Sequence, residues 1–126
     1  MMMLTSLLKH LFYYKKLGVL FAINDDDENS RSRNLPFNAG TAVAYGLSKE
    51  EALSAITLNA AKILGIDDKT GSVEVGKDAN IVVSDGDILD MKSNLISYAF
   101  IQGRQIDLHN KQTQLFEKYK AKYGIK

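Results

Sequence analysis

One stretch of the sequence decides which fold to expect: Gly71-Ser72-Val73-Glu74-Val75-Gly76-Lys77-Asp78-Ala79-Asn80-Ile81-Val82-Val83. Two glycines frame a short alternating segment, and glycine is the residue that most readily adopts the positive φ of a tight turn. A compact run of β-branched residues then predicts a buried strand. The pattern before this stretch is mostly helical, and most of the pattern after it is typical of a sheet. The stretch therefore marks the junction between an α/β region and a β module.

The composition is that of an ordinary globular protein. The chain has 126 residues, of which 45% are hydrophobic and 25% charged, enough for one domain with a modest core. Its formal net charge of +1 gives no general reason to expect nucleic acid or a membrane surface as a partner. Cysteine is absent, which excludes disulfides and thiolate metal sites and fits a reducing cytoplasm. Lys9 and His10 interrupt the apolar start too early for a signal peptide or a membrane helix.

The first part of the chain predicts a helix followed by a buried strand. Apolar residues at helical spacing run from Leu4 to Phe12, lysines follow at positions 15 and 16, and Gly18 ends this helix. The continuous apolar run 19–23 has the length and composition of a strand covered on both faces of a parallel sheet. Acidic residues follow it directly, and α/β enzymes place their chemistry at the carboxyl ends of such strands. The run 25–28 is therefore a candidate site, although a solvated loop is the favoured interpretation for the isolated chain.

Local signals mark the later elements. Pro36 suits the first turn of a helix over 37–45. The motif Ser48-Lys49-Glu50-Glu51 is a capping box that starts a helix, which we expect to continue until Gly65 closes it. A strand over 95–101 turns at Gln102-Gly103 into a hairpin. The last element is an amphipathic helix over 111–123, with an apolar side formed by Leu115, Phe116, Tyr119 and Tyr123.

Three pieces of the chain together resemble a known family. In order they are Gly46-Leu47-Ser48-Lys49-Glu50-Glu51-Ala52-Leu53, Thr57-Leu58-Asn59-Ala60-Ala61-Lys62-Ile63-Leu64-Gly65-Ile66, and the glycine-framed stretch 71–83. The combination resembles the C-terminal part of an amidohydrolase-superfamily enzyme of the imidazolonepropionase-related type. The resemblance covers about residues 4 to 107. Alanine at position 60 and isoleucine at position 88 stand where the family usually has proline, and neither change touches chemistry.

The resemblance implies an incomplete α/β fold. It consists of the last β/α units of a TIM-type (β/α)8 barrel, followed by the C-terminal strands of a composite β-sandwich. Residues 1–70 would form the terminal barrel segment, with 19–23 as the eighth strand. Residues 71–108 would form the sandwich strands, and residues 109–126 the C-terminal helix.

The same resemblance implies a metal-dependent hydrolase whose site this chain does not complete. The family binds zinc or another divalent metal through a His-x-His pair, further histidines, often a carboxylated lysine, and an aspartate at the end of the eighth strand. Here that aspartate is Asp26, with Asp25 as the alternative register; it would bind the metal and accept a proton from the metal-bound water. The chain contains only His10 and His109 and no His-x-His pair. Because catalytic metals normally take three protein ligands, we expect no metal to be bound by this chain alone.

Two functional hypotheses follow. In the first, the chain is the C-terminal fragment of a metal-dependent amidohydrolase acting on C–N bonds other than linear peptide bonds, such as those of cyclic amides, and is inactive alone. In the second, it is a non-catalytic α/β module that self-associates or docks on a partner chain. Both predict a cytoplasmic homo-oligomer or an association with the missing N-terminal part, and neither involves nucleic acid or membrane. A small-molecule substrate is expected only if the barrel is completed. The run Met1-Met2-Met3, ahead of what resembles a mid-barrel helix, favours an internal start of a longer enzyme.

Overall fold

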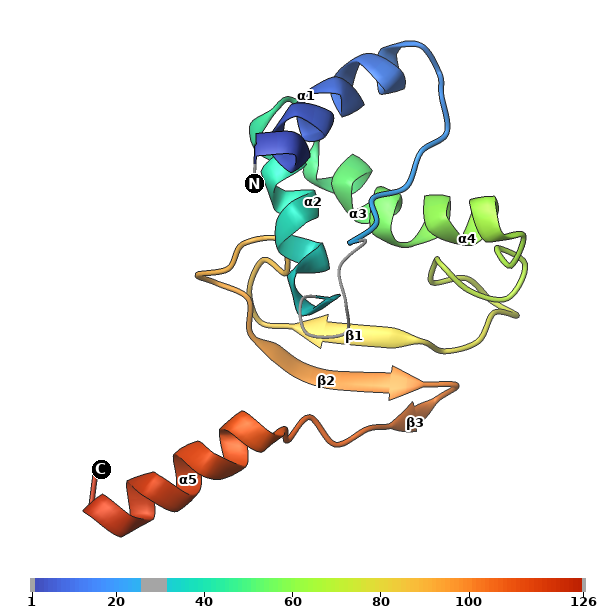
Figure 1. Ribbon diagram of the computed structural model, residues 1–126. Helices are drawn as coiled ribbons and strands as arrows, with labels where there is room; N and C mark the ends of the chain where they lie inside the picture. The colour runs from blue at the N-terminus through green and yellow to red at the C-terminus, as the bar shows by residue number, and fades with distance from the viewer. Residues whose placement is uncertain (1, 26–31, 126) are drawn as a thin grey trace.

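The structure is a computed structural model that describes residues 2–25 and 32–125. A layer of helices lies over one face of a small antiparallel sheet, and a C-terminal helix extends away from both (Figure 1). In chain order the elements are α1 (Met2–Lys16), the 3-10 helix η1 (Ser32–Asn34), α2 (Leu35–Ala44), α3 (Lys49–Ile56), α4 (Leu58–Leu64), β1 (Ile81–Ser84), β2 (Ile96–Ile101), β3 (Arg104–Gln105) and α5 (Lys111–Tyr123).

The helix termini follow the local signals of the sequence. Ser48 caps α3 as predicted: its hydroxyl accepts from the Glu51 backbone N–H at 3.2 Å, and the Glu51 carboxylate accepts from the Ser48 backbone N–H at 2.8 Å. Gly65 closes α4 with φ 69°, in the left-handed conformation that glycine adopts without strain. Pro36 lies in the first turn of α2, which begins at Leu35 and therefore slightly earlier than predicted.

The expectation of one helix from 49 to 64 was wrong, because the chain breaks at Thr57. This residue has φ −130° and ψ −92°, and it separates α3 from α4. Its hydroxyl donates to the Leu53 carbonyl at 2.7 Å, a local hydrogen bond that competes with the helical ladder. Beside it, the Ser54 hydroxyl donates to the Asn59 side chain at 2.9 Å across the break.

The predicted strand over 19–23 is also wrong. This segment is extended chain that follows α1, and within the described residues it pairs with no strand. The Ile23 backbone N–H instead donates to the Ala55 carbonyl in α3 at 3.1 Å. Val19 and Leu20 are 49% and 51% exposed, while Ile23 is buried. The run has the composition of a buried strand, but no neighbouring strand is present to supply a hydrogen-bond ladder.

The described strands form one sheet in the order β1-β2-β3, with both pairings antiparallel. Val82 lies opposite Ala99, and Ile101 lies opposite Arg104. The predicted hairpin is confirmed: Gln102 and Gly103, at φ 49° and 78°, connect β2 to β3. Where the sequence predicted strands of a sandwich, these residues contribute a single three-stranded layer.

The loop 85–95 attaches the sheet to the helices. It inserts Leu89 into the core beside Ala39 and Ala42 of α2, and all three side chains are buried. The approach is so close that a Cβ added to Gly40 would lie 2.1 Å from the Leu89 carbonyl oxygen. The core as a whole is small and rich in alanine; its buried members are Leu8, Ile23, Ala39, Ala42, Leu47, Ala52, Ala55 and Leu89.

The glycine-framed stretch attaches to α4. A Cβ on Gly71, which has φ 96°, would lie 2.6 Å from the Ala61 Cβ, so only glycine fits between this turn and the helix. The predicted alternation after it does not form a strand, since Val73 and Val75 are 82% and 108% exposed and the next strand is β1. The stretch therefore acts as a packed turn that leads from α4 to the sheet, as the glycines indicated.

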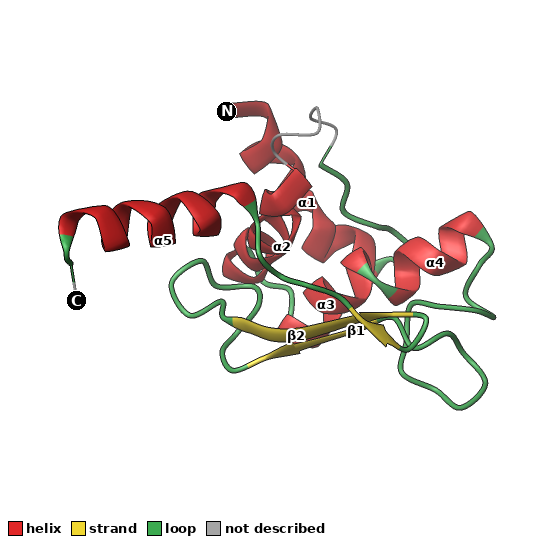
Figure 2. Cartoon of the chain, turned by 90° about the horizontal axis from the view of Figure 1, so that it is seen from below, coloured by secondary structure: helices red, strands yellow, loops and turns green. Residues whose placement is uncertain are grey.

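The predicted C-terminal helix is confirmed as α5, but it stands apart from the body. Its N-cap is Asn110, which exchanges hydrogen bonds with Thr113, and Gly124 closes it. Within the described part of the chain, α5 packs against no other helix or strand, and Figure 2 shows it projecting from one end of the molecule. Its apolar side chains are consequently exposed. No helix in the described residues is long and apolar enough to cross a lipid bilayer.

Candidate functional site

The segment 18–25 carries the chain from α1 across the helical layer to the predicted site. Gly18, at φ 70°, follows the end of α1, and the Val19 backbone N–H donates to the Tyr14 carbonyl at 3.0 Å. The hydrogen bond from Ile23 to Ala55 and the burial of the Ile23 side chain then fix the far end of the segment on α3. Packing on α3 therefore determines where Asn24 and Asp25 lie.

The side chain of Asp25 lies in an unusual environment. Its Oδ2 atom is buried and has no hydrogen-bond partner among the described residues. A buried carboxylate oxygen without a donor is costly, and in native proteins such an atom often marks a catalytic role or an unobserved ion. Asp26, the preferred candidate of the sequence, lies outside the described residues together with Asp27 and Glu28.

The described residues do not assemble a metal centre. No three side chains of histidine, cysteine, aspartate or glutamate in residues 2–25 and 32–125 lie close enough together to hold an ion. His10 lies on α1 and is exposed. His109 lies in the connection before α5, where its Nδ1 is 2.6 Å from Asp107 Oδ1. Hydrogen bonds from the His109 backbone and ring lower the pKa of the exposed Asp107 carboxyl. The two histidines therefore belong to separate surfaces.

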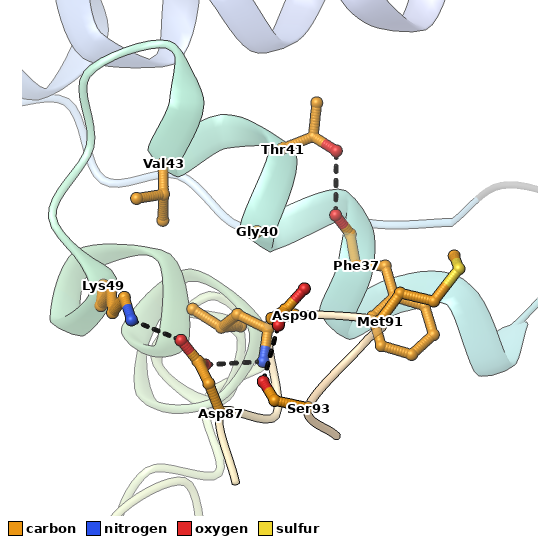
Figure 3. Close-up of a pocket in the computed structure, with 10 residues that line it drawn as sticks. Phe37, Gly40, Thr41, Val43, Lys49, Asp87, Asp90, Met91 and Ser93 are labelled. Carbon is orange, nitrogen blue, oxygen red and sulfur yellow. Dashed lines mark hydrogen bonds and ion pairs between the residues drawn. The ribbon is translucent and has the colours of Figure 1, made fainter.

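A cavity of about 560 Å³ lies between α2, the start of α3 and the loop 85–95 (Figure 3). Lys49 and Asp87 form an ion pair on its wall, with Nζ and Oδ2 2.5 Å apart. The other oxygen of Asp87 accepts from the Leu89 backbone N–H at 3.0 Å. Asp90 accepts from the Ser93 hydroxyl at 2.6 Å. Sequence reasoning missed this cluster because its lysine and its aspartates are about 40 residues apart in the chain.

The electrostatics of this cavity indicate a structural role. The hydrogen bond from Lys49 lowers the pKa of the Asp87 carboxyl, and the same bond raises the pKa of the Lys49 ammonium. The Ser93 hydroxyl lowers the pKa of Asp90 in the same way. All three groups are thereby held charged near neutral pH. None of the three groups has its pKa shifted toward neutral pH, as a group that transfers protons would. We therefore infer that the cluster has a structural role and ties the loop to the helices.

Comparisons with known proteins assign this arrangement to a class. An amidohydrolase of known structure from Thermotoga maritima MSB8 superimposes with a TM-score of 0.73 at 36% identity, over 79% of this chain and 26% of that one. An imidazolonepropionase of Picrophilus torridus is 39% identical over 103 residues, which are 75% of this chain and 25% of that protein. An adenine deaminase of Desulforamulus reducens is 32% identical over 102 residues, covering 79% of this chain and 17% of that protein.

The helices followed by a small antiparallel sheet are thus an arrangement found in amidohydrolases. The model of the amidohydrolase family matches residues 14–114, and the chain belongs to this family. The resemblance to imidazolonepropionase-related enzymes is confirmed. The chain spans about a quarter of the length of the first relatives that it matches. Most of α5 lies beyond the matched residues.

Proposed function

We propose that this chain supplies the C-terminal quarter of a metal-dependent hydrolase that acts on C–N bonds other than linear peptide bonds, such as those of cyclic amides. The observation that carries the proposal is the family match over residues 14–114, which includes the acidic run 25–28. The similarity to proteins named imidazolonepropionase supports the substrate class. In this proposal the chain is an incomplete part of a TIM-type barrel and is inactive alone.

The side chains of the described residues do not fit a metal ion by themselves, since they form no cluster of three ligands. The proposal therefore gives this chain one carboxylate ligand of zinc or another divalent metal, and it leaves the remaining ligands to the part of the relatives that this chain does not span. The family register gives Asp26 as that carboxylate. The Oδ2 of Asp25, which is buried and has no hydrogen-bond partner among the described residues, favours the alternative register.

The exposed apolar surface of the segment 19–23 supports the idea that the barrel is completed by additional protein. Val19 and Leu20 are about half exposed, although their composition is that of a strand covered on both faces. A neighbouring parallel strand would supply the missing hydrogen-bond ladder. Val19 and Leu20 are consecutive residues, which point to opposite faces of a strand, so the layers on the two faces of a completed barrel would cover them. The docking partner of this proposal is therefore a chain or segment that provides the preceding barrel strands.

Reconstitution tests the proposal directly. The 126-residue chain is purified and loaded with zinc, and it is also co-expressed with the part of the Thermotoga amidohydrolase that precedes its match to this chain. We expect no bound zinc and no turnover of five- and six-membered cyclic amides by the chain alone. We expect co-purification, bound zinc and turnover for the pair.

Matched variants then identify the carboxylate. In the co-expressed pair, Asp26→Asn is expected to lower kcat by on the order of 10²-fold or more, whereas Asp68→Asn, on the exposed surface after α4, should leave it unchanged. If Asp25→Asn has the large effect and Asp26→Asn does not, the alternative register holds. Stoichiometric zinc and turnover by the isolated chain contradict the proposal. A folded, zinc-bound pair without turnover on any cyclic amide contradicts the substrate class.

A second candidate function is a non-catalytic α/β module. The exposed apolar side of α5 favours it, because this helix has no partner among the described elements and most of it lies outside the family match. The two functions are distinguished by co-purification. A module that self-associates forms a stable oligomer without the barrel segment and gains no turnover from it.

A further inference from the structure

The exposed side of α5 is a surface that needs a partner. Four apolar side chains form it, here called the α5 stripe: Leu115, Phe116, Tyr119 and Tyr123, which are 41%, 61%, 49% and 65% exposed. At 100° per residue these positions fall within an arc of about 100° on one side of the helix. An isolated helix of 13 residues is marginally stable in water, so a folded α5 gains stability from tertiary contacts. The described part of the chain provides none.

A groove on the body has matching chemistry. The α2–sheet groove, about 860 Å³ in volume, is lined mainly by Phe37, Val82, Ile88, Met91, Ile96 and Leu108. Met91 and Val82 are 71% and 56% exposed, so the floor of the groove is open to solvent. An apolar groove beside a folded sheet is the kind of surface that receives the apolar face of an amphipathic helix.

We propose that the α5 stripe of one copy docks in the α2–sheet groove of a second copy, and reciprocally, so that the chain forms a two-fold dimer by exchange of α5. This inference goes beyond the proposed hydrolase function and does not depend on it. It makes the contact isologous, with the same stripe and the same groove used by both copies.

The connection to α5 prevents the helix from filling its own groove. Asn110, the N-cap of α5, itself lines the groove, and its side chain accepts from the Thr113 backbone N–H at 2.9 Å. A straight helix rises 1.5 Å per residue, so Tyr123 lies about 20 Å from the rim along the axis. Figure 1 shows α5 beyond β3, and Figure 2 shows it pointing away from the body of the molecule. Returning to its own groove would require the capped first turn to unfold, whereas the groove of another copy requires no such change.

Charge complementarity favours this groove over pairing of two α5 helices. Lys111, Lys118 and Lys122 flank the stripe along one edge and Lys120 flanks it along the other, so lysines would come together in a helix pair. The α2–sheet groove shares Phe37 and Met91 with the neighbouring cavity, whose wall carries Asp87 and Asp90. Asp87 is already paired with Lys49, so Asp90, whose pKa the Ser93 hydroxyl lowers, is the carboxylate left to attract a lysine of α5.

The lysine edge therefore lies toward the loop 85–95 in the proposed dimer. It lies away from Arg33 of η1, which is the charged residue in the groove lining, and the other edge of the stripe, toward Arg33, carries Lys120 alone.

The surface involved is large enough for a stable dimer. Given the exposed fractions of the α5 stripe, docking removes about 350 Å² from each helix, and two reciprocal contacts bury about 1,400 Å² in total. This area lies within the range of specific protein interfaces.

Light scattering on the complete chain gives the first test, over a range from about 1 to about 100 μM. We expect a dimer for the wild-type chain and a monomer for the double variant Phe116→Ser, Tyr119→Ser. The control Leu17→Ser removes an equally exposed apolar side chain, 76% exposed at the end of α1, and should remain dimeric. Circular dichroism checks that each variant stays folded. A wild-type chain that is monomeric across this range overturns the proposal.

The absence of cysteine allows a second test that reports which surfaces meet. Met91→Cys and Phe116→Cys are made in separate chains that carry tags of different size, then mixed and oxidised. We expect the disulfide between the two different chains to dominate, because Phe116 of one copy lies on Met91 of the other. The control mixture of Leu17→Cys with Phe116→Cys should give little of it. Efficient linkage of Phe116→Cys to itself would identify a helix pair and overturn the proposal.

Discussion

The ammonium of Lys49 lies 2.5 Å from the carboxylate of Asp87, a contact between residues 38 positions apart. Lys49 is the first residue of α3, and Asp87 lies in the loop 85–95 that follows β1. Two residues further along this loop, Leu89 enters the core between alanines of α2. The ion pair and the buried leucine together hold the sheet against the helices.

Replacing Lys49 with methionine keeps the length of the side chain and removes its charge. The folded state lowers the pKa of Asp87 below its ordinary value of 3.8, so the pair stabilises the fold above that value and loses its effect as the pH falls through the lowered pKa. Since Lys49 is largely exposed, we expect only a modest decrease in Tm. The difference between the two proteins should be present at neutral pH and vanish in strong acid, as measured by thermal unfolding at several pH values.

Salt provides the control for this prediction. At about 1 M NaCl the screening length falls to roughly 3 Å, so the difference in Tm between the wild type and Lys49→Met should shrink. A difference that persists unchanged in high salt and at low pH would mean that the methionine alters packing and not charge.

We expect alanine in place of Gly40 in α2 to destabilise the fold. A glycine-to-alanine change within a helix ordinarily stabilises by about 0.5–1 kcal/mol. Here the added Cβ would lie 2.1 Å from the Leu89 carbonyl oxygen, so we expect Gly40→Ala to lower the free energy of unfolding by about 1–3 kcal/mol. Urea unfolding measures the change. Gly65→Ala is the comparison: no atom lies within 4 Å of its added Cβ, and its cost of about 1–2 kcal/mol comes from the left-handed backbone alone.

The turn between β2 and β3 offers a stabilising substitution. Gln102 and Gly103 both have positive φ, 49° and 78°, as a type I′ turn requires. Asparagine is favoured over glutamine at the first of these positions, so Gln102→Asn should raise the free energy of unfolding by about 0.5 kcal/mol. The backbone N–H of residue 102 keeps its 2.9 Å hydrogen bond to Asn80. Gly103→Ala should destabilise the same turn, and a rise in stability there would show that the turn type is different.

The sequence predicted those features whose cause is local. The capping box at Ser48, the glycine cap at Gly65 and the hairpin turn at Gly103 each depend on a few neighbouring residues, and all three are confirmed. The strand predicted over 19–23 does not form, because a strand needs a neighbouring strand to pair with. The described residues supply no such neighbour for this segment. The break at Thr57 was missed because the helical spacing of apolar residues continues from α3 into α4. The hydrogen bonds of the Thr57 and Ser54 side chains determine the backbone conformation there.

The candidate site was only partly accessible to sequence reasoning for the same reason. The position of the acidic run after an apolar segment indicated where to look, and the resemblance indicated which carboxylate matters. The unpaired oxygen of Asp25 could not be foreseen, because it results from the way Ile23 is fixed on α3. The pair of Lys49 and Asp87 was missed because each residue alone resembles an ordinary surface charge.

The last prediction concerns the conflict between stability and function at Asp25. Its Oδ2 is buried without a donor among the described residues, and an unpaired carboxylate oxygen costs more to bury than a neutral amide does. We therefore expect Asp25→Asn to raise the free energy of unfolding of the isolated chain by about 1 kcal/mol. Asp68→Asn, at an exposed carboxylate, should leave this free energy unchanged.

The same substitution has the opposite consequence if Asp25 is the carboxylate that faces the ion in a completed barrel. Functional sites keep groups that destabilise the empty fold, so the oxygen that is unfavourable here would be the one that a cation requires. Urea unfolding of the isolated chain and turnover of the co-expressed pair measure the two effects. A gain in stability together with a loss of turnover identifies Asp25 as the carboxylate. A gain in stability with full turnover assigns the catalytic role to Asp26, and a loss of stability shows that the Asp25 carboxylate has a stabilising partner in the folded chain.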